Sequence, residues 1–196
     1  MRLLLVTGFL GSGKTTLILA LTHAARAAGR RVAILVNEVG EVGIDNQLMR
    51  QLELDVWELT SGCICCTLSA DLVTTLHKLD ATYGSDLVIV EPSGAADPAN
   101  LQRALPYYRG RPLESIRWAT VVDPLRLPML LEVLTPLITA GIAQADVLVI
   151  SKADLATPEE LARAQEAVRA INPRAPVHCL SLREGLAPEL VAELVP

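Results

Sequence analysis

Short apolar runs alternate with longer segments of helical periodicity along this chain. The runs are largely continuous rather than alternating, and they cover Leu3–Val6, Val32–Val36, Leu87–Val90, Ile116–Val122 and Val147–Ile150. Continuous runs of this length are typical of parallel strands that are buried on both faces. Strands that alternate with helices predict an α/β fold with a doubly wound, mostly parallel sheet flanked by helices.

Helix signals lie between these runs. Leucine and alanine recur at helical spacing before Gly29, at Leu17, Leu21, Ala24, Ala25 and Ala28. A second helical face is formed by Leu68, Leu72, Leu76 and Leu79. A third helix is predicted to begin at Pro158, with Thr157 as its N-cap and acidic residues in its first turn. Residues 104–115, rich in proline, glycine and tyrosine, predict a surface loop.

Composition narrows the class of protein. The chain has 196 residues, 51% hydrophobic and 20% charged, with a formal net charge of −5. This predicts one folded domain over residues 1–196 and excludes a disordered chain. The acidic balance and only 3% aromatic residues argue against a nucleic-acid surface. The longest apolar stretch, 125–150, is interrupted by proline and charged residues, so we expect a cytoplasmic protein without a membrane partner.

A phosphate-binding loop is predicted at residues 8–15, GFLGSGKT, between a strand and a helix. The motif G-x-x-x-x-G-K-[ST] needs that context, and it predicts a P-loop NTPase. Lys14 would reach the β- and γ-phosphates, and the Thr15 hydroxyl would hold Mg²⁺. The predicted nucleotide contacts here are Gly11, Ser12, Gly13, Lys14, Thr15 and Thr16. The alternative is an ordinary glycine-rich turn.

A base-reading motif is predicted after the strand at 147–150, where Ser151, Lys152 and Asp154 resemble the N-K-x-D of GTPases. An aspartate can accept hydrogen bonds from the N1–H and N2–H₂ of guanine, a donor pair that adenine lacks. Neutral hydrogen bonds contribute about 0.5–1.5 kcal/mol, so serine in place of asparagine should cost about tenfold in affinity at most. Ser181 follows the last short strand and is expected near the same base. A solvated K-x-D turn is the alternative.

Carboxylates follow two other predicted strands. Glu38, Glu41 and Asp45 lie in a glycine-containing loop, 37–45, whose place suits a γ-phosphate and Mg²⁺ sensor. Asp45 would act through a Mg²⁺-bound water or orient the attacking water, although a solvated turn is the alternative. Glu91 ends the strand at 87–90, where P-loop proteins place a second Mg²⁺-shell acid. Gly94 would donate its N–H to the γ-phosphate, unless this segment only caps a helix. Asp123 is predicted to cap a helix that starts at Pro124.

Three cysteines lie within four positions, at Cys63, Cys65 and Cys66. Three thiolates suit Zn²⁺, Cu(I) or another soft ion, with Glu38, Glu41, a water or a partner as fourth ligand. Two alternatives are a buried cysteine-rich turn and redox chemistry at the C-x-x-C of Cys63 and Cys66. The remaining cysteine and the histidines are predicted to be structural, with His178 and Cys179 in the core and His23 and His77 at the surface.

Five segments, taken in order, resemble the GTPase domain of the CobW family. They are GFLGSGKTTL, NEVGEVGID, ELTSGCICCTL, EPSGAADP and ADVLVISKADL. The resemblance runs from Met1 to about Ser181, and its specific part is the C-x-C-C element. It implies slow GTP hydrolysis coupled to binding and handing over zinc or cobalt, or to metallocofactor insertion. Carried onto this sequence, Lys14 and Thr15 serve phosphate and Mg²⁺, and Glu91 and Gly94 sense the γ-phosphate. The cysteines bind the metal, while Lys152 and Asp154 read guanine.

The expected function is therefore a metallochaperone that uses GTP, GDP, Mg²⁺ and Zn²⁺ or Co²⁺. Lys14, Asp45, Glu91 and Gly94 would carry the hydrolysis. Its partner would be a client metalloprotein or a cofactor-dependent enzyme, with a homodimer as a further arrangement. We expect the C-terminal domain of typical family members to be absent. One alternative is a nucleotide-dependent activator with a structural metal. Another is a small-molecule kinase whose lid would carry Arg103, Arg109, Arg111 and Arg117.

Overall fold

The computed structural model describes residues 1–37, 55–59, 67–92, 98–183 and 185–195. Seven strands form one sheet in the order β3-β2-β4-β1-β5-β6-β7, and every described pair is parallel. The strands are β1 (Arg2–Thr7), β2 (Val32–Asn37), β3 (Val56–Leu59), β4 (Leu87–Glu91), β5 (Ser115–Val122), β6 (Val147–Ile150) and β7 (Val177–Cys179). The α/β fold and the parallel sheet are confirmed.

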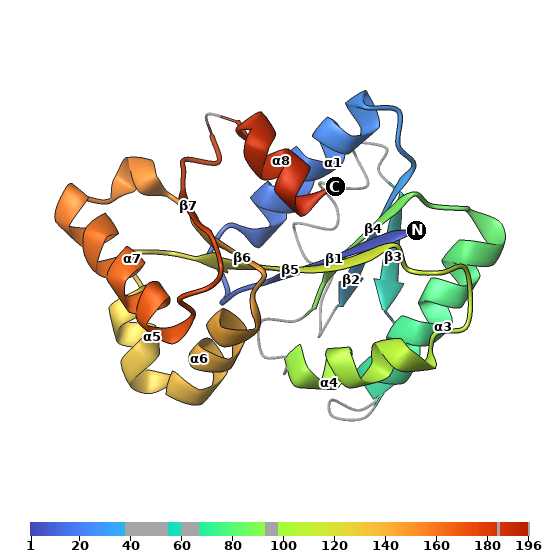
Figure 1. The fold of residues 1–196 in the computed structure, drawn as a ribbon, viewed down its shortest axis with the longest axis horizontal. Helices are drawn as coiled ribbons and strands as arrows, with labels where there is room; N and C mark the ends of the chain where they lie inside the picture. The colour runs from blue at the N-terminus through green and yellow to red at the C-terminus, as the bar shows by residue number, and fades with distance from the viewer. Residues whose placement is uncertain (38–54, 60–66, 93–97, 184, 196) are drawn as a thin grey trace.

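Helices cover both faces of this sheet, as Figure 1 shows. The helices are α1 (Lys14–Ala27), α3 (Thr67–Thr82), α4 (Pro98–Ala104), α5 (Leu127–Val133), α6 (Thr135–Gln144), α7 (Pro158–Ile171) and α8 (Pro188–Leu194). Short 3₁₀ helices lie at η1 (Leu105–Tyr107) and η2 (Ala153–Leu155). Helices α1 and α8 pack on one face of the sheet, and the other five pack on the opposite face.

Alternate residues of each central strand serve the two faces. In β1, Leu4 and Val6 pack with α1 and α8, whereas Leu3 and Leu5 pack with α3 and α4. All four are essentially inaccessible to solvent. Burial on both faces explains why these strands are continuously apolar in sequence. The predicted leucine face of α3 is also confirmed at three of its four positions, because Leu72, Leu76 and Leu79 are fully buried in this core. The fourth, the Leu68 side chain, lies outside the described part of the chain.

Helix ends agree with the sequence signals at two places and differ at a third. Helix α7 has a capping box in which the Glu160 N–H donates to Thr157 Oγ1 and the Thr157 N–H donates to the Glu160 carboxylate. Helix α1 ends at Ala27, just before Gly29, whose φ is +76°. The helix predicted to start at Pro124 begins instead at Leu127, because residues 124–126 form a turn.

The predicted surface loop over 104–115 is wrong in its first part. Helix α4 ends at Ala104 and continues into η1, and Leu105 and Tyr108 are buried. The Tyr108 ring lies 4.8 Å from that of His77, which also accepts a hydrogen bond from the Arg109 N–H. His77 is therefore half-buried and bonded rather than a free surface residue.

No single described helix is long and apolar enough to cross a membrane. The α5 and α6 pair reaches that length and apolarity only when taken together, across a bend of 118°.

Candidate nucleotide-binding site

The parallel sheet brings the predicted site residues to one edge. The carboxyl ends of parallel strands lie at the same edge, where open α/β sheets bind their ligands. The central strand β1 leads into residues 8–13. Its neighbour β4 ends at Glu91, and its other neighbour, β5, ends at Val122, directly before Asp123. Strand β6 lies beside β5 and leads into Ser151. Residues that are far apart in sequence are therefore neighbours at this edge.

The loop from residue 8 to residue 13 has a backbone that requires glycine. Gly8 has a φ of +138°, and a Cβ there would lie 2.3 Å from the Val121 carbonyl oxygen. Gly13 has a φ of +97°, and a Cβ there would lie 3.2 Å from Leu182. Within the loop, the Ser12 N–H donates to the Phe9 carbonyl over 3.1 Å. The predicted strand, loop and helix are thus present in the order that a phosphate loop needs.

Lys14 and Thr15, the first residues of α1, both reach Glu91. The Lys14 side chain is 8% exposed, with its Nζ 3.6 Å from one Glu91 oxygen. That Nζ also donates to the Phe9 carbonyl over 3.4 Å. The Thr15 hydroxyl donates to the other Glu91 oxygen over 3.5 Å. A hydroxyl and a carboxylate that meet beside a lysine form an oxygen donor set of the kind that Mg²⁺ prefers.

Ser151 ties the predicted base-reading turn, residues 151–154, to the phosphate loop. It is fully buried, and its hydroxyl lies 2.6 Å from the Ser12 carbonyl oxygen, to which it donates. The Val122 carbonyl is a second acceptor at 3.2 Å. The serine that replaces the asparagine of N-K-x-D therefore contacts the loop that would hold the phosphates.

Lys152 is the only residue other than glycine with a positive φ in the described part of the chain, at +54°. Its Nζ lies 2.7 Å from Asp123 Oδ2. Asp123 also caps the turn after β5, because its Oδ1 accepts from the Leu125 N–H over 3.0 Å. Asp123 therefore caps a turn and not the helix predicted to start at Pro124, and its ion pair with Lys152 is a role that the sequence did not reveal. Non-glycine residues in this backbone region are concentrated at functional sites.

Asp154 and Ser181 flank a backbone hydrogen bond that joins the turn at residues 151–154 to the segment after β7. The Ala153 N–H donates to the Leu180 carbonyl over 3.3 Å. Asp154 lies 3.9 Å from the exposed guanidinium of Arg183. Ser181, next in the chain after Leu180, is buried.

Two buried hydroxyls in this region have no hydrogen-bond partner in the described part of the chain. They belong to Ser12 in the phosphate loop and to Ser181 after β7. A buried polar group without a partner costs about 1–3 kcal/mol, so such groups in a native fold call for an explanation. A polar ligand that spans the phosphate loop and the base-reading turn would supply partners at both ends.

A small apolar cavity of about 50 Å³ lies behind the phosphate loop. It is lined by Phe9 and Leu10 from the loop, by Leu127 and Leu130 from α5, and by Ile142 from α6. Lys14, Thr15 and Glu91 are not among its described lining residues. This cavity therefore adjoins the phosphate loop, where Ser12 also lines it, without reaching those three residues.

Several predicted site residues lie outside the described residues, namely Glu38, Glu41, Asp45, Cys63, Cys65, Cys66 and Gly94. Their flanks are described. Asn37 and Leu59, the last residues of β2 and β3, are paired in register. The predicted sensor loop and cysteine segment thus both leave the sheet from this one edge. The described residues hold no group of three His, Cys, Asp or Glu that could bind a metal ion.

The other histidines and the fourth cysteine have structural partners or are exposed. His178 is half-buried and lies 2.8 Å from Glu193 of α8. Cys179 accepts a hydrogen bond from Gln165 of α7. His23 is exposed on α1, as predicted.

The arginines of the proposed kinase lid are not gathered over the phosphate loop. Arg111 bonds Asp80 of α3 and the Ser85 carbonyl just before β4, so it lies at the opposite edge of the sheet. Arg117 lies within β5, in register with Leu4. The Arg109 guanidinium bonds the Pro106 carbonyl. This arrangement does not support the kinase alternative.

The fold and the loop after β1 define a P-loop NTPase. The nucleotide-binding domain of the CobW/HypB/UreG family matches residues 2–179. The chain belongs to that family.

Relatives agree with this assignment. The zinc chaperone CobW of Pseudomonas aeruginosa is 38% identical over 129 residues, which are 61% of this chain and 32% of that protein. The zinc chaperone YjiA of Escherichia coli is 30% identical over 195 residues, 90% of this chain and 56% of that protein. The chain thus spans about a third to just over half of these relatives. The crystal structure of the hydrogenase maturation factor HypB from Archaeoglobus fulgidus has a TM-score of 0.68 at 19% identity. The matched region covers 98% of this chain and 87% of the HypB chain.

Proposed function

We propose that this chain binds and hydrolyses GTP and couples its nucleotide state to binding and delivery of zinc or cobalt to a client protein. The observation that carries the proposal is the link between two half-sites. Lys14, Thr15 and Glu91 form the phosphate half, and the Ser151–Asp154 turn is tied to it through the 2.6 Å contact with Ser12. The names of the relatives, zinc chaperones, support the metal.

In this proposal Lys14 holds the β- and γ-phosphates. The Lys14 ammonium lies beside the Glu91 carboxylate and donates a hydrogen bond to the Phe9 carbonyl. Phosphate oxygens would replace that carbonyl as the acceptor. Thr15 and Glu91 would hold Mg²⁺, which when bound neutralises charge on the phosphates. Asp45 would orient the attacking water, and Gly94 would donate to the γ-phosphate. Asp154 would accept from the guanine edge, with Ser181 beside the base.

The metal is the cargo in this proposal. Cys63, Cys65 and Cys66 would bind it, with Glu38 or Glu41 as a fourth ligand. The register pairing of Asn37 with Leu59 supports this set, because it starts the acidic segment and the cysteine segment side by side. Such thiols stay reduced in the cytoplasm, so the proposal includes a cytoplasmic location. A client metalloprotein, or a second copy of this single GTPase domain, would be the partner.

The test is reciprocal titration of nucleotide and metal. We expect Zn²⁺ to tighten the binding of GTPγS about 5–150-fold, and GTPγS to tighten Zn²⁺ by the same factor. Cys63→Ser should lose this effect while keeping the zinc-free affinity for GTPγS. Cys179→Ser is the matched control, because that cysteine lies on β7, accepts a hydrogen bond from Gln165 of α7 and should leave the coupling intact. Equal GTPγS affinity with and without zinc would contradict the coupling. Unfolding by a chelator would show a structural metal instead.

A further inference from the structure

Arg126 reaches the phosphate loop from the turn between β5 and α5. One nitrogen of its guanidinium donates to the Leu10 carbonyl over 2.7 Å. The guanidinium carbon lies 5.4 Å from the centre of the Phe9 ring, within the range of a cation–π contact. A Cβ on Gly11 would lie 3.1 Å from the same guanidinium. One side chain thus covers three consecutive residues at the tip of the loop.

Packing alone holds this tip only weakly. Leu10 is 75% exposed, and the cavity of about 50 Å³ lies behind Phe9 and Leu10. The two ends of the loop are held more closely, by the approach of Gly8 to the Val121 carbonyl and by the bond from Ser151 to Ser12. The tip between them is the stretch on which Arg126 acts.

The contact with Leu10 sets the direction of the next peptide N–H. The C=O and N–H of a trans peptide point in opposite directions, and the described chain has no cis peptide bond. Because the Leu10 carbonyl points to Arg126, the Gly11 N–H points to the other side. Phosphate loops bind their ligand through such converging N–H groups. A guanidinium that holds the carbonyl from outside therefore presets a donor for the phosphate.

We propose that Arg126 is a positioning residue, which fixes the Leu10–Gly11 peptide in the phosphate-binding orientation. This inference rests on the proposed nucleotide binding. The same turn also meets the base-reading half of the site, because the Arg126 N–H donates to the Asp123 carbonyl over 3.2 Å and Asp123 binds Lys152. Arg126 thereby connects the base-reading turn to the tip of the phosphate loop.

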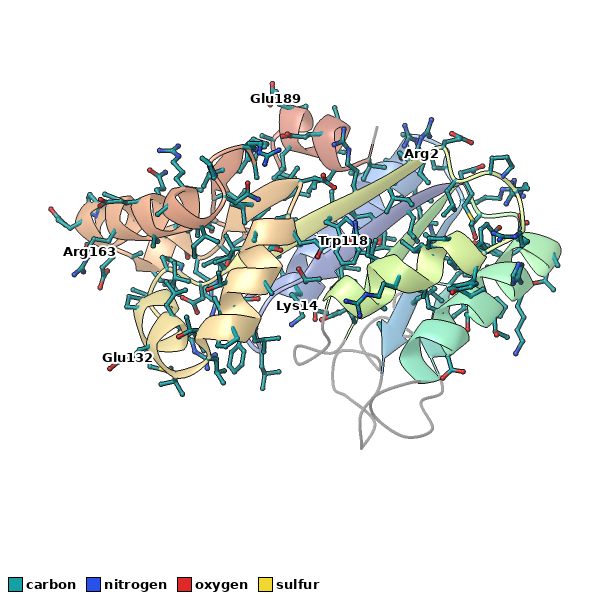
Figure 2. The ribbon with its side chains drawn as sticks, turned by 60° about the horizontal axis from the view of Figure 1, so that its bottom comes forward. Arg2, Lys14, Trp118, Glu132, Arg163 and Glu189 are labelled. Carbon is teal, nitrogen blue, oxygen red and sulfur yellow. The ribbon has the colours of Figure 1, made fainter. Side chains whose placement is uncertain are left out.

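The experiment compares GDP and GTPγS affinity in three variants. Arg126→Met keeps the aliphatic stem against the cavity and removes the hydrogen-bond donor to Leu10. We expect the dissociation constants for GDP and GTPγS both to rise by about tenfold, equivalent to about 1.4 kcal/mol. Hydrolysis should show a raised KM with kcat within about twofold, as for lost uniform binding. Arg126→Lys restores a donor to Leu10 and should stay within about threefold of the parent. Arg163→Met, on α7 and away from Lys14 in Figure 2, is the control for loss of a surface charge.

If the parent protein binds both GDP and GTPγS and Arg126→Met binds them with the same affinities, this inference is overturned. The proposed function would then still stand. A larger loss for GTPγS than for GDP would also overturn it, because that pattern indicates direct contact with the γ-phosphate. A parent that binds neither nucleotide would overturn the proposed function and this inference with it. Thermal unfolding of each variant checks that the fold is retained.

Discussion

At the scale of single residues, Ser151 replaces the asparagine of the N-K-x-D motif and contacts the phosphate loop. The sequence motif predicts weaker guanine recognition because asparagine is missing. In the fold, the smaller side chain is buried with its hydroxyl on the Ser12 carbonyl. Ser151 therefore supports the phosphate loop, whatever it contributes to the base.

We predict that Ser151→Ala lowers the free energy of unfolding by about 1–3 kcal/mol, because the buried Ser12 carbonyl loses its donor. The variant should also bind GDP more weakly. Ser85→Ala is the matched control, since Ser85 is equally buried and its hydroxyl has no partner in the described part of the chain. Urea unfolding measures both variants. Equal losses in the two would mean that the bond to Ser12 contributes nothing to stability.

Sequence reasoning found most of the residues that the structure gathers at this edge and missed what joins them. Lys14, Thr15, Glu91 and the serine of the base-reading turn follow strands or open a helix, so motif spacing located them. The pairing of Asp123 with Lys152 depends on β5 lying beside β6, which no local pattern encodes. Arg126 carries no motif, and its reach to Leu10 appears only once β5 lies beside β1.

At the scale of elements, the segment after α4 shows why a loop was predicted where buried structure exists. Proline, glycine and tyrosine are common in surface turns, and these residues are dense over 104–115. Here Tyr108 is buried against α3, and Arg111 bonds Asp80 of the same helix. Long-range contacts with α3, rather than local propensity, determine this segment.

The Asp80 contacts give a pH-dependent stability. Hydrogen bonds from the side chain and backbone of Arg111 lower the pKa of Asp80 from its ordinary value of 3.8. A carboxyl whose pKa is lower in the folded chain stabilises the fold above its unfolded pKa, and that stability is lost as pH falls through the folded pKa. Burial, with the Asp80 carboxylate nearby, raises the pKa of Tyr108 to about 12.

We therefore predict that Asp80→Asn destabilises the fold by about 1 kcal/mol at pH 7, since it removes a carboxylate bonded by Arg111. The difference from the parent should shrink between pH 4 and pH 2, where the parent itself becomes protonated. Urea unfolding across this range measures the difference. Glu166→Gln, on the exposed side of α7, is the control for loss of a carboxylate. A difference that stays constant with pH would contradict the assigned ion pair.

At the scale of the whole molecule, the continuous apolar runs predicted a parallel sheet but not its strand order. The strand order depends on how the helices that connect the strands pack on the sheet. Those packing contacts join residues that are distant in sequence. Arg2 of β1, for example, pairs in register with both Leu87 and Ser115. This central position of β1 is what places the loop after it between Glu91 on one side and Asp123 on the other.

Nucleotide binding should stabilise this molecule as a unit. We predict that GDP at a hundred times its dissociation constant raises the free energy of unfolding by about 2.7 kcal/mol, because the ligand binds only the folded chain. ADP at the same concentration should raise it far less. Asp154→Asn should abolish the difference between the two nucleotides, since a neutral amide no longer accepts both guanine donors. Thermal unfolding measures these shifts, and equal stabilisation by GDP and ADP in the parent would refute guanine selectivity.

The central place of β1 also has a consequence for biosynthesis. A ribosome makes β1 and the phosphate loop before β4 and β5, the partners on either side of β1. Helix α8, which closes the core over α1, comes later still. The nascent chain must therefore shelter the apolar strand β1 until β4 and β5 have been made. A chaperone that covers β1 during this interval should raise the yield of folded protein.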